Sequence, residues 1–158
     1  MCGIVGGIAQ RNVVPILLEG LKRLEYRGYD SAGLAVIHDN EIYRKRELGK
    51  VKGLEVMLLA DPIAGNIGIA HTRWATHGKP STQNAHPHIC RNKVAVVHNG
   101  IIENHEQLKS QQLEDGYLFT SQTDTEVIVH QIFDALETSG DFVEAVKHSI
   151  AKLDGAYA

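Results

Sequence analysis

Cysteine is scarce in this sequence of 158 residues, where only Cys2 and Cys90 occur. Two cysteines cannot build the disulfide framework of a small secreted domain, so we expect a reducing compartment. Basic residues are not in excess, because the formal net charge is −3. This balance gives no electrostatic reason to expect nucleic acid or a membrane surface as a partner. Long apolar runs and a convincing signal peptide are also absent. We therefore expect a soluble, cytoplasmic protein.

The order of the expected elements favours an α+β fold, because strands and hairpins come first and no β-α-β rhythm follows. No repeat, low-complexity segment or linker divides the chain, whose length suits one domain. A long polar loop is expected over residues 73–92, and loops of this length inside compact domains are usually functional or disordered. Alternating and helical patterns predict strands at residues 3–9, 32–37, 41–48, 67–72 and 94–97, and helices at 12–24, 51–59, 104–113, 123–136 and 141–150.

Cys2 becomes the first residue if an aminopeptidase removes Met1, and it then carries both a thiol and a free α-amine. A free thiol titrates near pH ~8.5 and a chain α-amine near ~7.7–8. Both values are close enough to neutrality for the thiolate to act as a nucleophile and the amine as its proton acceptor. The apolar, glycine-containing residues that follow predict a strand able to hold this nucleophile at a sheet edge. In isolation, Cys2 would be interpreted only as a small hydrophobic residue.

Asn99-Gly100 follows a predicted buried strand. An Asn amide and a Gly N–H at a strand end can both point at one oxygen, as an oxyanion hole requires. Asn-Gly is also the strongest dipeptide signal for a turn. Taken alone, the pair favours the turn.

The segment from Arg73 to Gly78 contains side chains suited to an anionic ligand. The guanidinium of Arg73 offers a fork that fits a carboxylate, and Thr76 and His77 add hydrogen-bond donors. Trp74 could cover a bound ligand. The alternative is a solvated loop with a packed tryptophan.

Asp124 lies inside Thr123-Asp124-Thr125-Glu126, which has the form of a capping box at the start of a helix. Its carboxylate could simply favour the helix N-terminus, or it could pair with the ammonium group of a ligand. Together, Asp124 and Arg73 would match both charged ends of an α-amino acid, and only that combination is informative.

His86, His88 and Cys90 form a second, competing constellation. In an extended segment, residues two apart face the same side, so these three side chains could converge on a zinc ion. No C-x-x-C partner exists in the sequence. A metal-binding or interaction module is therefore an alternative interpretation, and we expect no metal.

Five blocks follow one another over almost the whole chain: CGIVG (residues 2–6), RLEYRGYDSAG (23–33), HTRWATHG (71–78), HNGIIEN (98–104) and SQTDTE (121–126). In this order they closely resemble the glutaminase domain of the glutamine–fructose-6-phosphate aminotransferase family, the glucosamine-6-phosphate synthases. Other class II amidotransferases, such as the phosphoribosyl and asparagine-forming ones, share the Cys-Gly start. They are not expected to carry the second and third blocks in this form.

The resemblance implies an N-terminal-nucleophile (Ntn) hydrolase fold, a four-layer α/β/β/α sandwich. L-glutamine would be the substrate, and no cofactor is implied. By the family's pattern, Cys2 would be the nucleophile, while Asn99 and Gly100 would form the oxyanion hole. Arg73, Thr76 and His77 would bind the carboxylate of glutamine, and Asp124 would bind its α-amine. Trp74 would gate the departure of ammonia, and Arg27 would lie near the catalytic terminus.

The resemblance also implies that residues 1–158 are a type-2 glutamine amidotransferase (glutaminase) domain that is incomplete at its C-terminal end. The two phosphosugar-binding isomerase domains of the family are absent from the sequence. Fructose 6-phosphate would contact only those domains, and the parent enzyme is expected to be a homo-oligomer. We expect the piece by itself to be poorly stable or inactive.

Overall fold

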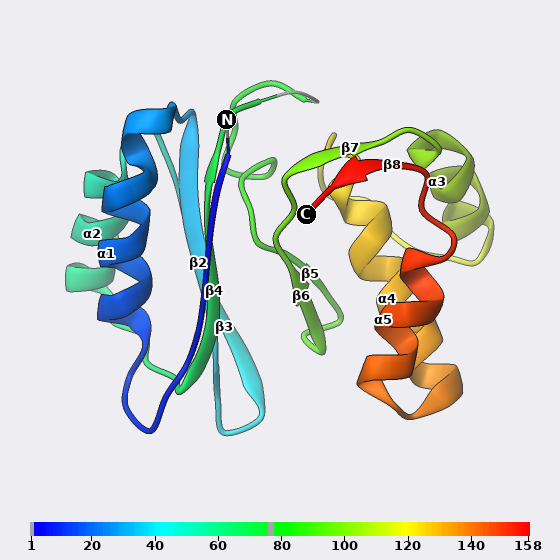
Figure 1. Cartoon of the computed structure of the whole chain (residues 1–158), viewed down its shortest axis with the longest axis horizontal. Coiled ribbons are helices and arrows are strands. Elements are labelled where there is room, and N and C mark those ends of the chain that lie inside the picture. Colours follow the sequence, from blue (N-terminus) through cyan, green and yellow to red (C-terminus); the bar gives the residue numbers. More distant parts are fainter. Residues whose placement is uncertain (1, 76–77) are drawn as a thin grey trace.

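Four antiparallel strands form the largest sheet of the structure, a computed structural model that describes residues 2–75 and 78–158. Their spatial order is β1-β4-β2-β3 (Figure 1). The turn between β2 and β3 is at Asp39-Asn40, both with positive φ, as a tight hairpin turn requires. In chain order the strands are β1 (Gly3–Ile8), β2 (Ser31–His38), β3 (Glu41–Leu48) and β4 (Ile67–Arg73).

Two helices, α1 (Val14–Leu24) and α2 (Val51–Ala60), cover the outer face of this sheet (Figure 1). Leu17 and Leu21 of α1 are fully buried one turn apart, where they form part of an apolar core with the sheet. Asn12 accepts a hydrogen bond from the N–H of Val14 at 3.1 Å, so it organises the start of α1. The predicted helix is confirmed, and a short 3-10 helix, η1 (Glu25–Arg27), follows it.

The second half of the chain builds another β layer and another helical layer (Figure 1). Its strands pair as β5 with β6 and as β7 with β8, both antiparallel. Its apolar core includes Val127, Ile132 and Phe133 of α4, packed with residues of the strands and of α5. The elements of this half are β5 (His88–Cys90), β6 (Val94–Val96), β7 (Gly100–Ile102), α3 (His105–Glu114), α4 (Thr125–Ser139), α5 (Phe142–Ile150) and β8 (Gly155–Tyr157).

The four layers run α/β/β/α, so the predicted α+β, four-layer sandwich is confirmed (Figure 1). Each half has its own apolar core, and polar groups join the two β layers. Arg44 donates to the carbonyl of Pro87 at 3.1 Å, and Arg46 donates to the carbonyl of Ala85 at 2.8 Å. Gly33 lies so close to the carbonyl of His86 that a Cβ there would meet it at 2.1 Å.

Two expectations about local structure were wrong. Residues 73–92 are not a continuous loop, because β5 forms within them and turns into β6 at Arg91-Asn92, both with positive φ. The capping box is not formed either. Glu126 instead accepts from the backbone N–H groups of Thr120 and Ser121 at 2.9 and 2.7 Å, so it organises the loop before α4. Spacing alone could not show which donors would reach this carboxylate.

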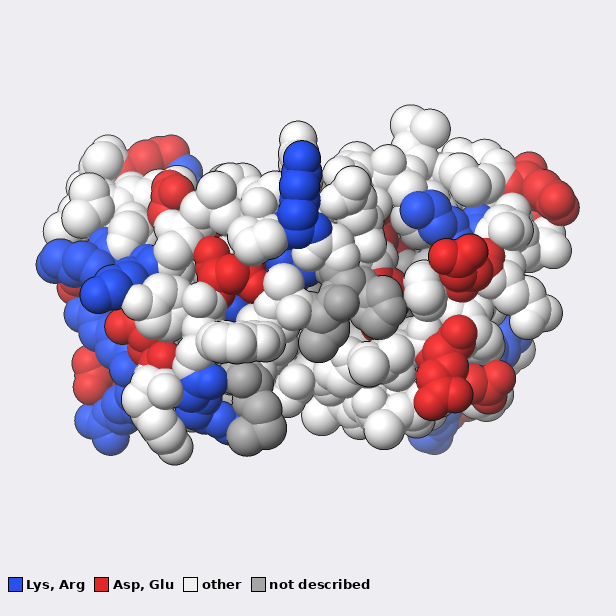
Figure 2. All heavy atoms as spheres, turned by 90° about the horizontal axis from the view of Figure 1, so that it is seen from above, with Lys and Arg blue, Asp and Glu red and all other residues white. Residues whose placement is uncertain are grey.

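The surface shows the mixed charge that the composition predicts. Figure 2 shows basic and acidic side chains on both halves of the face seen from above. None of the helices in the described part of the chain is long and apolar enough to cross a membrane.

The close approach at Gly33 gives a stability prediction. We expect Gly33→Ala to lower the free energy of unfolding by roughly 1–3 kcal/mol, because the new methyl group would displace the backbone of His86. Gly6→Ala is the matched control, since a Cβ at Gly6 meets nothing within 4 Å. Urea unfolding of both variants measures the difference. Equal midpoints for the two variants would contradict the proposed contact between the layers.

Candidate active site

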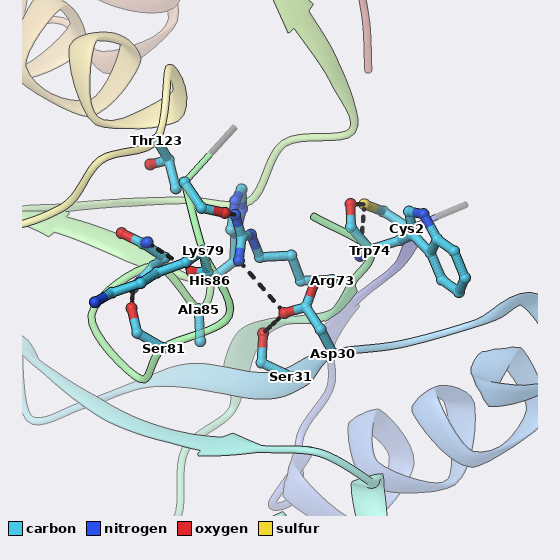
Figure 3. A network of polar contacts seen from close by, with 12 residues as sticks. Cys2, Asp30, Ser31, Arg73, Trp74, Lys79, Ser81, Ala85, His86 and Thr123 are labelled. Carbon is cyan, nitrogen blue, oxygen red and sulfur yellow. Dashed lines mark hydrogen bonds and ion pairs between the residues drawn. The ribbon is translucent and has the colours of Figure 1, made fainter. Parts of the chain in front are cut away.

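Cys2 lies beside Trp74 because β1 pairs with β4 in a register that places Gly3 opposite Thr72. The backbone N–H of Trp74 donates to Sγ of Cys2 at 3.3 Å, and Sγ lies 3.6 Å from the carbonyl oxygen of Trp74 (Figure 3). The N–H of Gly3 donates to Oγ1 of Thr72 at 3.1 Å. A Cβ at Gly3 would meet that oxygen at 2.8 Å and Leu24 at 2.9 Å. The backbone next to Cys2 is therefore held at close contact, with the thiol half-buried.

A cavity of about 460 Å³ opens at Cys2, between the two β layers. It brings together six of the residues predicted from the sequence. Thr76 and His77 lie outside the described residues, and Arg27 is not among the described residues of the cavity lining. Arg27 instead precedes Gly28, which contacts the Trp74 ring. The predicted residues in the lining are Cys2, Arg73, Trp74, Asn99, Gly100 and Asp124.

Arg73 is a buried cation whose partly buried counterion, Asp30, sequence reasoning missed. Its Nη1 lies 3.3 Å from Oδ1 of Asp30, and its Nη2 donates to the carbonyl of Gly78 at 2.9 Å (Figure 3). The hydroxyl of Ser31 also donates to Oδ1 of Asp30, at 2.8 Å. A charge taken out of water needs such a partner, so Asp30 both neutralises and orients the guanidinium. No local sequence pattern pointed to this pair.

Asn99-Gly100 does not form a turn, so that reading of the dipeptide was wrong. The N–H of Asn99 donates to the carbonyl of Ala158 at 2.9 Å, and the N–H of Ala158 donates back at 2.8 Å. Gly100 begins β7 with φ at +145°, and a Cβ there would meet the carbonyl of Ala156 at 2.2 Å. Only glycine fits this position without strain. The pairing with β8 thus holds both residues at the cavity wall.

Asp124 precedes α4, but its carboxylate makes no capping hydrogen bond to the helix. Its Oδ2 accepts from the N–H of Ile102 in β7 at 2.9 Å, which ties the start of α4 to that strand. Asp124 is buried and lines the same cavity as Arg73. The cavity therefore contains a cationic and an anionic side chain, the combination that a zwitterionic α-amino acid requires.

Four histidines, His71, His86, His88 and His98, are buried beside the cavity, and His86 and His98 line it. The rings of His71 and His86 stack with centroids 4.1 Å apart. Burial lowers the pKa of His71 to about 3. Burial, followed by the neighbouring His71, His88 and His98, lowers the pKa of His86 well below its usual range. His71 and His86 are consequently neutral at physiological pH and act as fixed hydrogen-bonding groups.

The alternative metal site is not assembled, because its residues have three different partners. Nδ1 of His86 accepts from the N–H of His98, Nε2 of His88 contacts Oγ1 of Thr123, and Sγ of Cys90 contacts Nδ1 of His130. β5 begins only at His88, so the alternation of a strand does not extend to His86. Within residues 2–75 and 78–158, no group of three or more His, Cys, Asp or Glu could hold a metal ion.

Comparison with known proteins identifies similar sequences and structures. A family described as a glutamine amidotransferase domain matches residues 71–158. The chain is 62% identical over 158 residues to a protein of Pseudomonas putida named glutamine–fructose-6-phosphate aminotransferase [isomerizing]. It is 59% identical over 157 residues to a Shewanella oneidensis protein of the same name. Each alignment covers 99% of this chain but only 26% of the relative, so the chain spans about a quarter of their length.

Two solved structures share the fold. Glutamine phosphoribosylpyrophosphate amidotransferase from B. subtilis, complexed with ADP and GMP, aligns with a TM-score of 0.78 at 29% identity. It covers 99% of this chain, and the aligned part is 33% of that protein. A structure described as the allosteric regulatory enzyme of purine biosynthesis aligns with a TM-score of 0.77 at 31% identity, covering 99% of this chain and 34% of that one.

The buried histidines predict a loss of stability in mild acid. Burial holds the folded-state pKa of His71 and of His88 at about 3, against an ordinary value of 6.5. Below pH 6.5 the unfolded chain therefore binds protons that the native state excludes. We expect the free energy of unfolding to fall steadily as the pH is lowered from 6.5 to 5.

Urea unfolding at several pH values checks this expectation. His88→Gln should reduce the slope of the free energy of unfolding against pH by an amount that corresponds to at most one bound proton. His38→Gln, on the exposed end of β2, serves as the control. A flat profile across this pH range, or identical slopes for wild type and His88→Gln, would contradict it.

Proposed function

This chain belongs to the family of glutamine amidotransferase domains, and on that premise we propose that it hydrolyses the side-chain amide of glutamine and releases ammonia. The resemblance carried by the five sequence blocks agrees with the 62% and 59% identities to named relatives. The observation that carries the proposal is a single cavity of about 460 Å³ lined by Cys2, Asn99, Gly100, Arg73 and Asp124.

In the proposed complex, Arg73 binds the α-carboxylate of glutamine and Asp124 binds its α-ammonium group. Support comes from the opposite charges of these two buried side chains in one cavity. Asp30 neutralises Arg73 in the free protein and keeps its guanidinium in place. Thr76 and His77, from the same sequence block as Arg73, are proposed as further carboxylate contacts.

We propose that the first chemical step forms a thioester. The thiol of Cys2 transfers its proton to its own α-amine, and the thiolate attacks the amide carbon of glutamine. Negative charge then develops on the amide oxygen, where the Asn99 side chain and the N–H of Gly100 would stabilise it. The amine returns the proton to the leaving nitrogen, so the C–N bond breaks and ammonia departs.

In the second step, water attacks the thioester carbon and gives up a proton to the α-amine. The C–S bond breaks, glutamate leaves, and the proton restores the thiol of Cys2. The sum is glutamine plus water giving glutamate plus ammonia. No redox partner or additional reactant is required, since one residue provides the nucleophile and the base.

We further propose that the whole protein transfers this ammonia to fructose 6-phosphate and forms glucosamine 6-phosphate, in amino-sugar biosynthesis in the cytoplasm. The names of the relatives support this proposal, and the sugar chemistry would lie in the remaining three-quarters of their length. Trp74, 53% exposed at the cavity, would gate the departure of ammonia, with Arg27 supporting it next to Gly28. The whole protein is proposed to be a homo-oligomer.

Replacement of each cysteine in the full-length protein tests the proposed nucleophile. Cys2→Ala should abolish glutaminase turnover and labelling by a glutamine-like electrophile, because no other thiol lines the described part of the cavity. Cys90→Ala is the matched control and should retain both, since burial raises the pKa of the Cys90 thiol to about 11. Turnover that persists in Cys2→Ala would end the proposal.

A further inference from the structure

His98, which immediately precedes Asn99, is held by hydrogen bonds on both sides of its backbone. Its N–H donates to Nδ1 of His86 at 3.2 Å. Its carbonyl oxygen lies 3.0 Å from Nε2 of His71 and, because a carbonyl can only accept, His71 is the donor. All three histidines are buried, so water does not compete for these bonds. The backbone that leads into Asn99-Gly100 is therefore fixed by two imidazoles.

The hydroxyl of Thr125 connects two of these histidine rings. Its Oγ1 lies 2.9 Å from Nδ1 of His98 and 3.4 Å from Nε2 of His86. Because Nδ1 of His86 accepts a proton from the backbone, the neutral ring carries its own proton on Nε2 and donates it to Thr125. The hydroxyl of Thr125, which has one proton and two acceptor lone pairs, also hydrogen-bonds with Nδ1 of His98.

These hydrogen bonds form a closed ring. The backbone N–H of His98 donates to His86, His86 donates to Thr125, and Thr125 hydrogen-bonds back to the side chain of His98. The backbone N–H fixes the tautomer of His86, because Nδ1 accepts and Nε2 must then carry the ring proton. We call this circuit, made of His86, His98 and Thr125, the hydroxyl–imidazole ring.

The same turn of α4 also holds the other end of the cavity wall. Asp124, the residue before Thr125, accepts from the N–H of Ile102, two residues beyond Gly100. Thr125 thus fixes the segment before Asn99-Gly100, and Asp124 fixes the segment after it. Neither contact uses the side-chain amide of Asn99 or the N–H of Gly100, the groups that would meet the substrate.

We propose that Thr125 is a positioning residue for the amide-hydrolysing site, acting through the hydroxyl–imidazole ring to set the direction of the Asn99 and Gly100 donors. This inference rests on the proposed function. Losing one donor of an oxyanion hole costs about 10²–10³-fold in kcat, and small misplacements of a catalytic group also carry large costs. Thr125 would therefore affect the transition state, where negative charge is on the oxygen, more than the binding of glutamine.

Substitutions at Thr125 in the full-length protein separate this role from simple packing. Thr125→Val keeps the shape and removes the hydroxyl, and we expect kcat for glutamine hydrolysis to fall roughly tenfold or more. KM for glutamine should change by less than about threefold, because Arg73 and Asp124 remain in place. Thr125→Ser keeps the hydroxyl and should restore kcat to near the wild-type value.

Thr138→Val is the matched control, because it removes a threonine hydroxyl from the exposed face of the same helix and should leave kcat unchanged. The inhibition constant of L-glutamate reports whether the binding groups are intact in each variant. If Thr125→Val does not fold, Thr125→Ala removes the hydroxyl without the β-branched bulk and should show the same selective loss of kcat.

Equal kcat values for the hydroxyl-free variants and Thr125→Ser, or a loss confined to KM, would overturn the inference. That failure differs from failure of the proposed function. If wild-type turnover depends on Cys2 while Thr125→Val behaves like Thr125→Ser, only the positioning role is wrong. If Cys2→Ala retains full turnover, the proposed function itself is wrong.

Discussion

The hydrogen bond from His71 to the carbonyl of His98 joins the two halves of the molecule, and the candidate site depends on that junction. Each half buries its own apolar core, so hydrophobic packing within a half cannot set the position of one half against the other. The cavity takes Cys2, Arg73 and Trp74 from one half and Asn99 and Asp124 from the other. A buried polar group left without a hydrogen-bond partner costs about 1–3 kcal/mol. This cost favours the one arrangement of the two halves in which such groups are paired.

Burial of the histidines also determines which chemistry they can perform. A general base works best when its pKa is near the working pH, whereas burial lowers the pKa of His71 to about 3. This imidazole is thus suited to positioning and is a poor proton acceptor. In the proposed mechanism, proton transfer therefore belongs to the α-amine of Cys2, and the histidines would hold the backbone that meets the developing charge.

Much of the fold could be predicted from the sequence because its signals are local. Leu17 and Leu21 identify one face of α1, and Asp39-Asn40 identifies the hairpin between β2 and β3. Asp141 caps α5 by accepting from the N–H of Glu144, at the start of the helix predicted over residues 141–150. The predicted residues Cys2 and Asp124 meet at one cavity although they are distant in the sequence.

Most of the errors and omissions concern contacts between distant segments, while the capping box failed locally because Glu126 accepts from Thr120 and Ser121. Asp30 pairs with Arg73 across 43 positions, and Thr125 reaches His98 across 27. Whether Asn99-Gly100 turns or continues into a strand depends on the pairing of β7 with β8. Composition and spacing do not contain that information, because each contact exists only after the layers have packed.

The central claim is that Cys2 supplies both the nucleophile and the base, and that it does so only as the first residue. Its most direct test uses a full-length precursor in which a cleavable segment precedes Cys2. Glutaminase turnover is measured before and after a protease removes this segment and makes Cys2 the first residue. In the precursor the nitrogen of Cys2 is an amide and cannot accept a proton. General-base assistance is worth ~10²–10⁴-fold, so turnover should rise at least roughly a hundredfold on cleavage. Equal turnover before and after cleavage would contradict the claim, because the α-amine would then not be the base.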